Sequence, residues 1–322
     1  MSVSVIARHA DRIHAAIESD APAKSALVAS WRRSAALHRL DPAERKSPRR
    51  LTDHELAQAR QRIEPLIRAS QAVLDRLYLA VGGSGCCVLL ADRDGVPIER
   101  RGAIADDDTF QDWGLWTGTL WNEENEGTNG IGTCLVEGRA LTIHRDQHFY
   151  TKNTLLSCTT APIYDHEGNL AAALDVSSCR ADLTEGFVQL IAIALGDAVR
   201  RIETENFRLA YPEARIVIAP TPNQTPGALL AVDGQDLVIG ATRSARMAFG
   251  LTPEALAKPF PAADLLGGET SFAVDIREAE RAILERALIH SKGNVTAAAR
   301  TLGLSRATLH RKLARLGLRS VH

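Results

Sequence analysis

Basic side chains gather at the end of the chain in a pattern that suits contact with nucleic acid. From Arg286 to His322 there are eight Lys and Arg and no acid, whereas Gly102–Gly138 holds eight acids and no Lys or Arg. The whole chain of 322 residues has 38 Lys and Arg against 39 Asp and Glu, a net charge of −1. This near-neutral average therefore hides a basic segment that is typical of a DNA-binding module.

A helix predicted near residues 306–316 presents a polar face that suits the major groove. An Arg near a helix N-terminus can donate two hydrogen bonds to guanine O6 and N7, and Arg306 stands at such a place. Lys and Arg further along the helix suit phosphates. A solvated basic helix without a ligand is the alternative. The predicted face consists of Ser305, Arg306, Thr308, His310, Arg311, Lys312 and Arg315.

A second group of residues, in the middle of the chain, suits a pocket for a small polar molecule with an apolar body. Three of the four Trp lie in the acidic segment, and Trp combines apolar area with an N–H donor. A Gly-rich turn follows, and then a cluster of His and aromatic residues. The predicted ligand-binding residues are Phe110, Trp113, Trp116, Trp121, Asn129, His144, His148, Phe149, Cys158 and Thr160.

Each of these residues also has a structural interpretation. The aromatic cluster can equally belong to a core or an interface, and the Gly-rich turn lacks the third Gly of a dinucleotide loop. His144 and His148, four residues apart near Asp146, suit one face of a helix, but structural histidines are favoured and no metal is predicted. Cys158 is a candidate thiol sensor, although a buried Cys is usually inert. No catalytic residue and no cofactor are predicted, apart from an unidentified effector.

The elements that must position these residues predict an α+β fold. Residues 1–80 have apolar side chains at helical spacing, and Thr52 with Glu55 forms a capping box at one helix start. Residues 81–180 change to short strands with two hairpins that turn at glycine, and residues 183–209 return to helix. Strands flanked by helices indicate a domain with one antiparallel sheet.

The stretch after this domain is rich in Pro and harder to interpret. Two strands around Asp233-Gly234 and a following helical turn are predicted in it. Because it is shorter than a common domain, it is interpreted as a truncated PAS-like segment or a structured linker. The predicted organisation is a helical segment that packs on a sensor, the sensor domain, this linker and an all-α DNA-binding domain, at residues 1–80, 81–209, 210–270 and 271–322.

Three helices are predicted over residues 272–316, with clear start and end signals. Asn294 or Thr296 caps the second helix, Ser305 caps the third, and Gly303 supplies the turn between them. A helix-turn-helix also needs small residues where its helices cross and apolar residues in the shared core. These are supplied by Ala298, Ala299, Leu302, Leu304, Leu309 and Leu313.

The string KGNVTAAARTLGLSRATLHRKLARLGL resembles the Fis-type helix-turn-helix of the nucleoid protein Fis and of bacterial enhancer-binding regulators. The resemblance implies that Arg306 contacts a base, whereas His310 stands where Fis itself has a basic residue. It also implies a dimer, to which the helix around Ile276–Leu288 contributes, on half-sites about one helical turn apart. Contacts to the backbone or groove, and to phosphates at the preceding helix, are implied for Thr308, Arg311 and Lys312 and for Asn294 and Thr296.

The middle domain resembles a GAF domain, and residues from about 25 to 205 resemble the N-terminal part of the acetoin-catabolism-regulator family. The strings are SWRRSAALHRLDP, VLLADRDGVPIERRG, NEENEGTNGIGTCLVEGRALTIHRDQHF and CTTAPIYDHEGNLAAALDVSS. Such domains bind small molecules between the sheet and the layer of loops and helices over it. Regulators of this kind usually carry a central ATPase domain, but neither a Walker A string nor a sigma-54-contacting loop occurs here.

These features predict a sequence-specific transcriptional regulator that binds double-stranded DNA as a homodimer and senses a small molecule, without ATP hydrolysis or sigma-54 remodelling. RNA polymerase and a full-length related regulator are further candidate partners. The first alternative is a non-activating partner of such a regulator. The second is a GAF-type methionine-sulfoxide reductase, against which Cys86 and Cys87 argue, because neighbouring strand residues point to opposite faces.

Membrane and export signals do not appear in the sequence. No run approaches the ~18 apolar residues of a membrane span, and the N-terminal residues lack the apolar core of a signal peptide. The five Cys match no zinc spacing and no disulfide frame. A cytoplasmic, nucleoid-associated protein is therefore expected.

Overall fold

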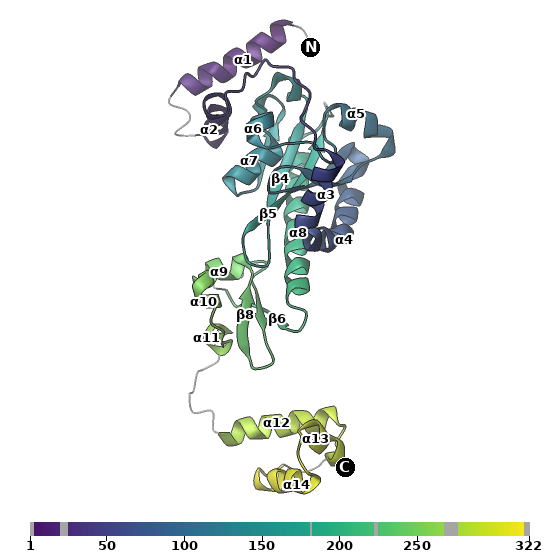
Figure 1. Cartoon of the computed structure of the whole chain (residues 1–322), viewed down its shortest axis with the longest axis vertical. Helices are drawn as coiled ribbons and strands as arrows, with labels where there is room; N and C mark the ends of the chain where they lie inside the picture. The colour runs from purple at the N-terminus through teal and green to yellow at the C-terminus, as the bar shows by residue number, and fades with distance from the viewer. Residues whose placement is uncertain (1–2, 20–24, 181, 222–224, 267–275, 319–322) are drawn as a thin grey trace. The chain divides into compact units, whose positions relative to one another are not determined.

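The computed structural model describes residues 3–19, 25–180, 182–221, 225–266 and 276–318. The chain divides into two compact units, Met1–Leu265 and Leu266–His322. The first unit combines helices with sheets, and the second consists of helices (Figure 1). Within the described residues, no helix has the length and apolar character that crossing a membrane requires.

Helices make up the N-terminal part of the first unit, as the spacing of its apolar residues predicts. They are α1 (Val3–Glu18), α2 (Ala26–Arg32), the π-helical turn η2 (Arg33–Leu37), α3 (Asp53–Arg62), α4 (Glu64–Val81) and the short turn η3 (Gly82–Ser84). The predicted capping box opens α3. The Glu55 N–H donates to Thr52 Oγ1 at 3.3 Å, and the Thr52 N–H donates to Glu55 Oε2 at 2.8 Å. Two N–H groups that the helix itself leaves unpaired are thereby satisfied.

A five-stranded antiparallel sheet lies at the centre of the first unit, in the order β2-β1-β5-β4-β3. Both predicted hairpins form, β1 with β2 and β4 with β5. The α+β class with an antiparallel sheet is thereby confirmed. The strands are β1 (Cys86–Asp92), β2 (Pro97–Arg101), β3 (Leu141–His144), β4 (Ser157–Tyr164) and β5 (Leu170–Ser178).

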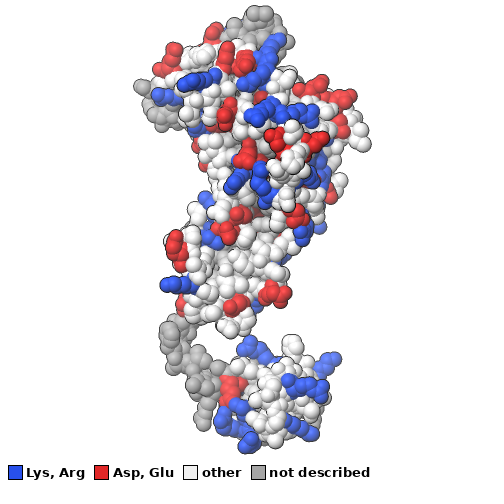
Figure 2. Space-filling view, in the orientation of Figure 1, with Lys and Arg blue, Asp and Glu red and all other residues white. Residues whose placement is uncertain are grey.

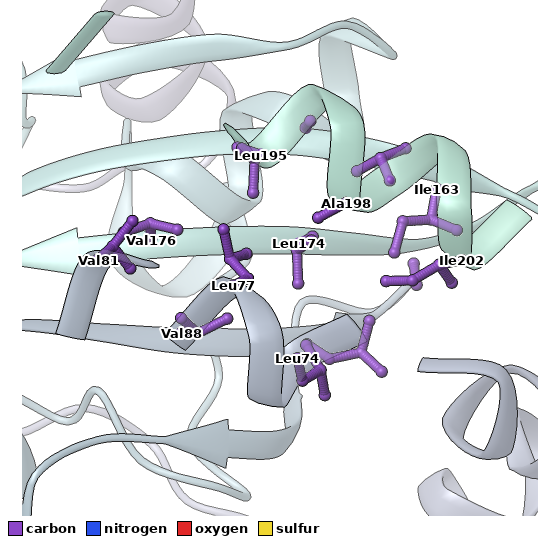
Figure 3. Packing of buried hydrophobic residues seen from close by; sticks show 14 of the residues in the cluster. Leu74, Leu77, Val81, Val88, Ile163, Leu174, Val176, Leu195, Ala198 and Ile202 are labelled. Atoms are coloured by element: carbon purple, nitrogen blue, oxygen red, sulfur yellow. The ribbon is translucent and has the colours of Figure 1, made fainter. Parts of the chain in front are cut away.

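Each face of this sheet has its own cover. Helices α4 and α8 (Glu185–Ala210) lie on one face, where Leu77, Leu174 and Ile202 pack in a shared apolar core (Figure 3). The opposite face, called here the sensor face, carries a second core with Cys87 and Leu89. Short elements cover it, namely η4 (Ile104–Asp106), α5 (Asp107–Asp112), α6 (Glu123–Glu126), α7 (Gly130–Glu137), η5 (Arg145–Gln147) and η6 (Thr151–Asn153).

A small second sheet follows α8 within the same unit. Its order is β6-β7-β8-β9, all antiparallel, and the predicted pair of strands around Asp233-Gly234 forms its centre. Phe207 and Tyr211, at the end of α8, pack against Leu229 and Ala231 of this sheet. The segment is therefore folded and attached to α8. Its elements are β6 (Arg215–Ile218), β7 (Leu229–Val232), β8 (Leu237–Ala241), α9 (Arg243–Phe249), α10 (Pro253–Leu256), β9 (Phe260–Pro261) and α11 (Ala263–Leu266).

The second unit contains α12 (Ile276–His290), α13 (Val295–Thr301) and α14 (Arg306–Arg315). Asn294 caps α13 and Ser305 caps α14, which agrees with the caps expected from the sequence. Leu302 and Leu304 are only half-buried, at the edge of the packed interior. The buried core shared by the three helices consists of Leu284, Ala287, Ala298, Ala299, Leu309 and Leu313.

Candidate functional site

The start of α14 holds the first of the residues predicted to read DNA. Arg306 is exposed and is the first residue of the helix, directly after Ser305. The Ser305 Oγ accepts a hydrogen bond from the Thr308 N–H at 3.1 Å, which fixes where the helix begins. His310 and Arg311 are exposed further along the same helix. Most of the charged side chains on the visible face of this unit are Lys or Arg (Figure 2).

The start of α13 offers a second exposed polar site. The Asn294 Oδ1 accepts hydrogen bonds from the Thr296 N–H at 3.0 Å and from the Ala297 N–H at 3.1 Å. Asn294 and Thr296 are both exposed. Because the amide oxygen of Asn294 acts within the helix cap, its amide nitrogen and the Thr296 hydroxyl are the groups that can donate to a phosphate.

Two of the predicted DNA contacts are paired within the second unit. Lys312 and Arg315 both form ion pairs with Glu280 of α12. The hydrogen bond from Lys312, helped by Arg315, holds the pKa of Glu280 below its usual value. The count of charges from Arg286 onward missed this acid, which lies just upstream. The charges of Lys312 and Arg315 are therefore partly neutralised within the unit.

The predicted aromatic residues lie on the sensor face, but they are not equivalent. Phe110 and Trp121 are buried in its core, and the Trp121 indole N–H donates to the Gly114 carbonyl at 2.7 Å. Trp113 is half-buried against the same core. The Trp116 ring lies 4.2 Å below the Arg100 guanidinium. The structural interpretation therefore accounts for Trp121, whereas Trp116 has a charged partner that sequence reasoning missed.

A line of buried polar side chains crosses the sensor face. The hydroxyls of Thr160 and Ser177 donate to the two carboxylate oxygens of Asp175 at 2.5 and 2.6 Å. The Cys158 Sγ lies 3.1 Å from the Ser177 Oγ and 3.4 Å from the His148 Nε2. The structure thus brings together three of the predicted ligand-binding residues, and adds the buried Asp175.

Burial sets the protonation of this line. It lowers the pKa of His148 to about 4, raises that of Asp175 to about 6 and raises that of Cys158 well above the usual value of a thiol. His148 is neutral at pH 7, and its Nδ1 donates to the Arg145 carbonyl at 2.9 Å. Its Nε2 then accepts from the Cys158 thiol. A protonated buried thiol is a poor nucleophile and a poor metal ligand.

Asn129 and α7 cover the buried polar line. The Asn129 Oδ1 accepts from the Gly132 N–H at 2.8 Å and caps α7. A Cβ at Gly130 would lie 2.6 Å from both Cys158 Cβ and Thr160 Oγ1, so only glycine permits this approach. The N-terminus of α7 therefore packs directly on Thr160 and Cys158.

His144 and Phe149 lie apart from this line. The His144 Nδ1 pairs with the Ser157 Oγ at 2.9 Å at the end of β3, and η5 separates it from His148, so the two histidines do not share a helix face. Phe149 packs with Trp31 and the N-terminal helices. Within the described residues, no group of three His, Cys, Asp or Glu is arranged to hold a metal ion.

Sequence reasoning also missed a polar clamp between the N-terminal helices and the Gly-rich loop, formed by Ser30, Arg33, Glu123 and Thr128. Arg33 donates to both carboxylate oxygens of Glu123, at 2.9 and 3.0 Å. The Ser30 hydroxyl donates to Glu123 at 2.5 Å and lies 2.7 Å from the Thr128 hydroxyl. The clamp thus joins α2 and η2 to α6 and the Gly-rich loop.

The substitution Asp175→Asn is expected to change the stability of the chain more favourably at pH 7.5 than at pH 4.5. Burial raises the pKa of Asp175 to about 6 from an ordinary 3.8, so its contribution to stability is present below pH 3.8 and is lost as pH rises through 6. The variant has no carboxyl group at this position, so it does not lose stability in this way as the pH rises. Thermal unfolding of both proteins across this range measures the difference, with the exposed Asp108→Asn as control. A difference that does not change with pH would contradict the expectation.

Comparison with protein families matches both units. The GAF domain model matches residues 65–199, and the model for the Fis family of bacterial regulatory proteins matches residues 275–316. A crystal structure of the E. coli DhaR(N)–DhaL complex is similar in fold, with a TM-score of 0.52 and 16% identity over 79% of this chain and 85% of that one.

Curated relatives match more than half of the chain. The acetoin catabolism regulatory protein of Cupriavidus necator is 33% identical over 72% of this chain and 36% of its own length. The AcoR activator of the acetoin dehydrogenase operon in Bacillus subtilis is 28% identical over 56% of this chain and 30% of its own length. The chain thus spans about a third of the length of these relatives. It carries a GAF domain and a Fis-type helix-turn-helix, and it is a homologue of the acetoin catabolism regulators.

Proposed function

We propose that this chain is a transcriptional regulator that binds double-stranded DNA as a dimer, and that a small molecule in its GAF domain changes this binding. The exposed Arg306 at the capped start of α14 supports the proposal most directly. The chain acts in the cytoplasm, without ATP hydrolysis or sigma-54 remodelling. In support of this, no Walker A string lies between the two matched domains.

In this proposal the effector binds on the sensor face. Trp113, Trp116 and Thr160 supply contacts there, and α7 moves aside to admit the ligand. The four-part division of the chain, with boundaries at residues 80, 209 and 270, remains part of the proposal. Gel shifts with the DNA upstream of the gene test it. Binding no stronger than to random DNA at ~150 mM salt would contradict it, because contacts to phosphates alone fade there.

Arg306→Ala is expected to weaken specific DNA binding by about 1–3 kcal/mol, because a guanidinium at the helix start can pair with one guanine. Specificity should relax at a single base pair. Fluorescence anisotropy with a set of single-base variants of the site measures both effects. Arg201→Ala, which removes an exposed Arg of the first unit that pairs with Asp197, is the control and should bind like the wild type. An equal loss on specific and random DNA would instead assign Arg306 to a phosphate.

The reductase alternative gains no support from the thiols. Cys86, Cys87, Cys134 and Cys158 are buried, Cys179 is half-buried, and burial raises the pKa of all five. A reductase needs an accessible thiol of low pKa. Turnover of methionine sulfoxide with a thiol donor would revive this alternative. Co-purification with a full-length regulator would favour the mixed-dimer alternative.

A further inference from the structure

Arg100 lies on the sensor face at the end of β2. Its partner in the strand register is Leu89 of β1, which belongs to the sensor-face core. The next residue, Arg101, points to the other side and pairs with Asp75 of α4. Strand alternation thus places one Arg toward each face. The Arg100 side chain is only 10% exposed.

The surroundings of Arg100 leave half of its guanidinium without a partner. The Trp116 ring lies 4.2 Å from it and the Phe110 ring 5.5 Å. Nη1 lies 2.7 Å from the Asp107 Oδ1. Nε and Nη2 are buried and have no hydrogen-bond partner among the described residues. A buried donor on a charged group is rarely left unsatisfied, so an acceptor from outside the chain would complete this arrangement.

The two unpartnered donors lie on the same edge of the guanidinium. The Nε–H and one Nη2–H bond are parallel, and this edge matches the two oxygens of a carboxylate. A single ketone or hydroxyl oxygen can only share the two donors, without two parallel hydrogen bonds. Gly102 lies close to the guanidinium, where a Cβ would be 2.3 Å from Nη2 and 2.7 Å from Cζ, so a side chain at this position would displace Arg100. The aromatic rings exclude water and strengthen the pairing.

We propose that the effector of the GAF domain carries a carboxylate, which the Nε and Nη2 groups of Arg100 bind with two parallel hydrogen bonds. The proposal rests on the proposed ligand-sensing function and names its ligand class. Asp107, whose side chain is 32% exposed, acts as an internal competitor that neutralises part of the guanidinium charge in the unliganded chain. The segment Asp107–Asp112 that carries Asp107 and Phe110 must shift to admit the ligand.

Matched pairs of acids and amides test this ligand class. Thermal unfolding of the full chain is measured with lactate and lactamide, pyruvate and pyruvamide, and benzoate and benzamide, at constant ionic strength. At least one acid should raise the unfolding temperature while its amide does not. By titration calorimetry, Arg100→Gln should then bind that acid about 10- to 100-fold more weakly. Asp107→Asn should bind it more tightly, because the competing charge is gone.

Control variants distinguish loss of the paired Nε and Nη2 donors from loss of the fold. Arg101→Gln removes the neighbouring Arg on the other face and should bind the acid like the wild type. Arg100→Lys keeps the positive charge but lacks the paired donors, so it should stay folded and bind the acid weakly. No stabilising acid in the panel, an amide that binds as well as its acid, or an Arg100→Gln affinity within about threefold of the wild type would each overturn the proposal. DNA binding that still depends on Arg306 would show that the regulatory function survives such a failure.

Discussion

Replacing Arg33 by alanine is expected to lower the free energy of unfolding of the first unit by about 3–5 kcal/mol, because it leaves a buried charge without its partner. Glu123 is only 2% exposed, and Arg33 donates to both of its oxygens. Arg33 also pairs with Glu137 at 2.8 Å. Chemical denaturation of the variant and the wild type measures the change.

The two sides of this clamp should respond unequally. Glu123→Gln should cost less than Arg33→Ala, because Arg33 is 28% exposed and keeps Glu137 as a partner. The double variant Arg33→Ala/Glu123→Gln should recover part of the loss, since the buried charge is removed together with its partner. Arg32→Ala, which removes an exposed neighbouring Arg, is the matched control and should change stability by less than about 0.5 kcal/mol. Equal losses for Arg33→Ala and Glu123→Gln would contradict this account.

The sequence predicts the central sheet well because its signals are local. β1 is an apolar run that ends at Asp92 before a glycine turn, and β4 and β5 flank a second glycine turn, so each hairpin partner is adjacent in the sequence. The second sheet is predicted only in part. β6 is a four-residue strand in a Pro-rich stretch, and β9 is Phe260-Pro261, where Pro argues against a strand. Both are edge strands whose pairing depends on tertiary contacts, and they give little local signal.

The candidate sites divide in the same way. The caps at Asn294 and Ser305 and the exposed Arg306 follow from short-range spacing, so the helix-turn-helix is predictable. The Glu280 ion pairs join residues 32 and 35 positions apart, and the Arg33–Glu123 pair spans 90 positions. Periodicity carries no information about such pairs. The sequence could have indicated Arg100, because it stands two residues after the buried Ile98 in β2. The lack of hydrogen-bond partners for its Nε and Nη2 among the described residues is visible only in the structure.

Leu309→Ala is expected to unfold the second unit and to abolish specific DNA binding while the first unit stays folded. Leu309 is fully buried among Leu284, Ala298 and Leu313. Truncating a buried Leu to Ala costs about 2–5 kcal/mol. A single core in so small a domain rarely supplies more than about 3–5 kcal/mol, so the substitution removes most or all of its stability.

We expect Leu309→Ala to unfold the second unit alone. Calorimetry should retain the transition of the first unit, because the chain divides into two separate compact units. DNA affinity should fall by more than about 30-fold, because it is proportional to the fraction of the second unit that stays folded. Leu309→Met, which conserves volume, should cost less than about 1.5 kcal/mol and keep binding. His310→Ala changes an exposed neighbour and should leave the fold intact. If Leu309→Ala kept the affinity of the wild type, α13 and α14 would not act through a shared core, and DNA binding would have to be assigned to another surface.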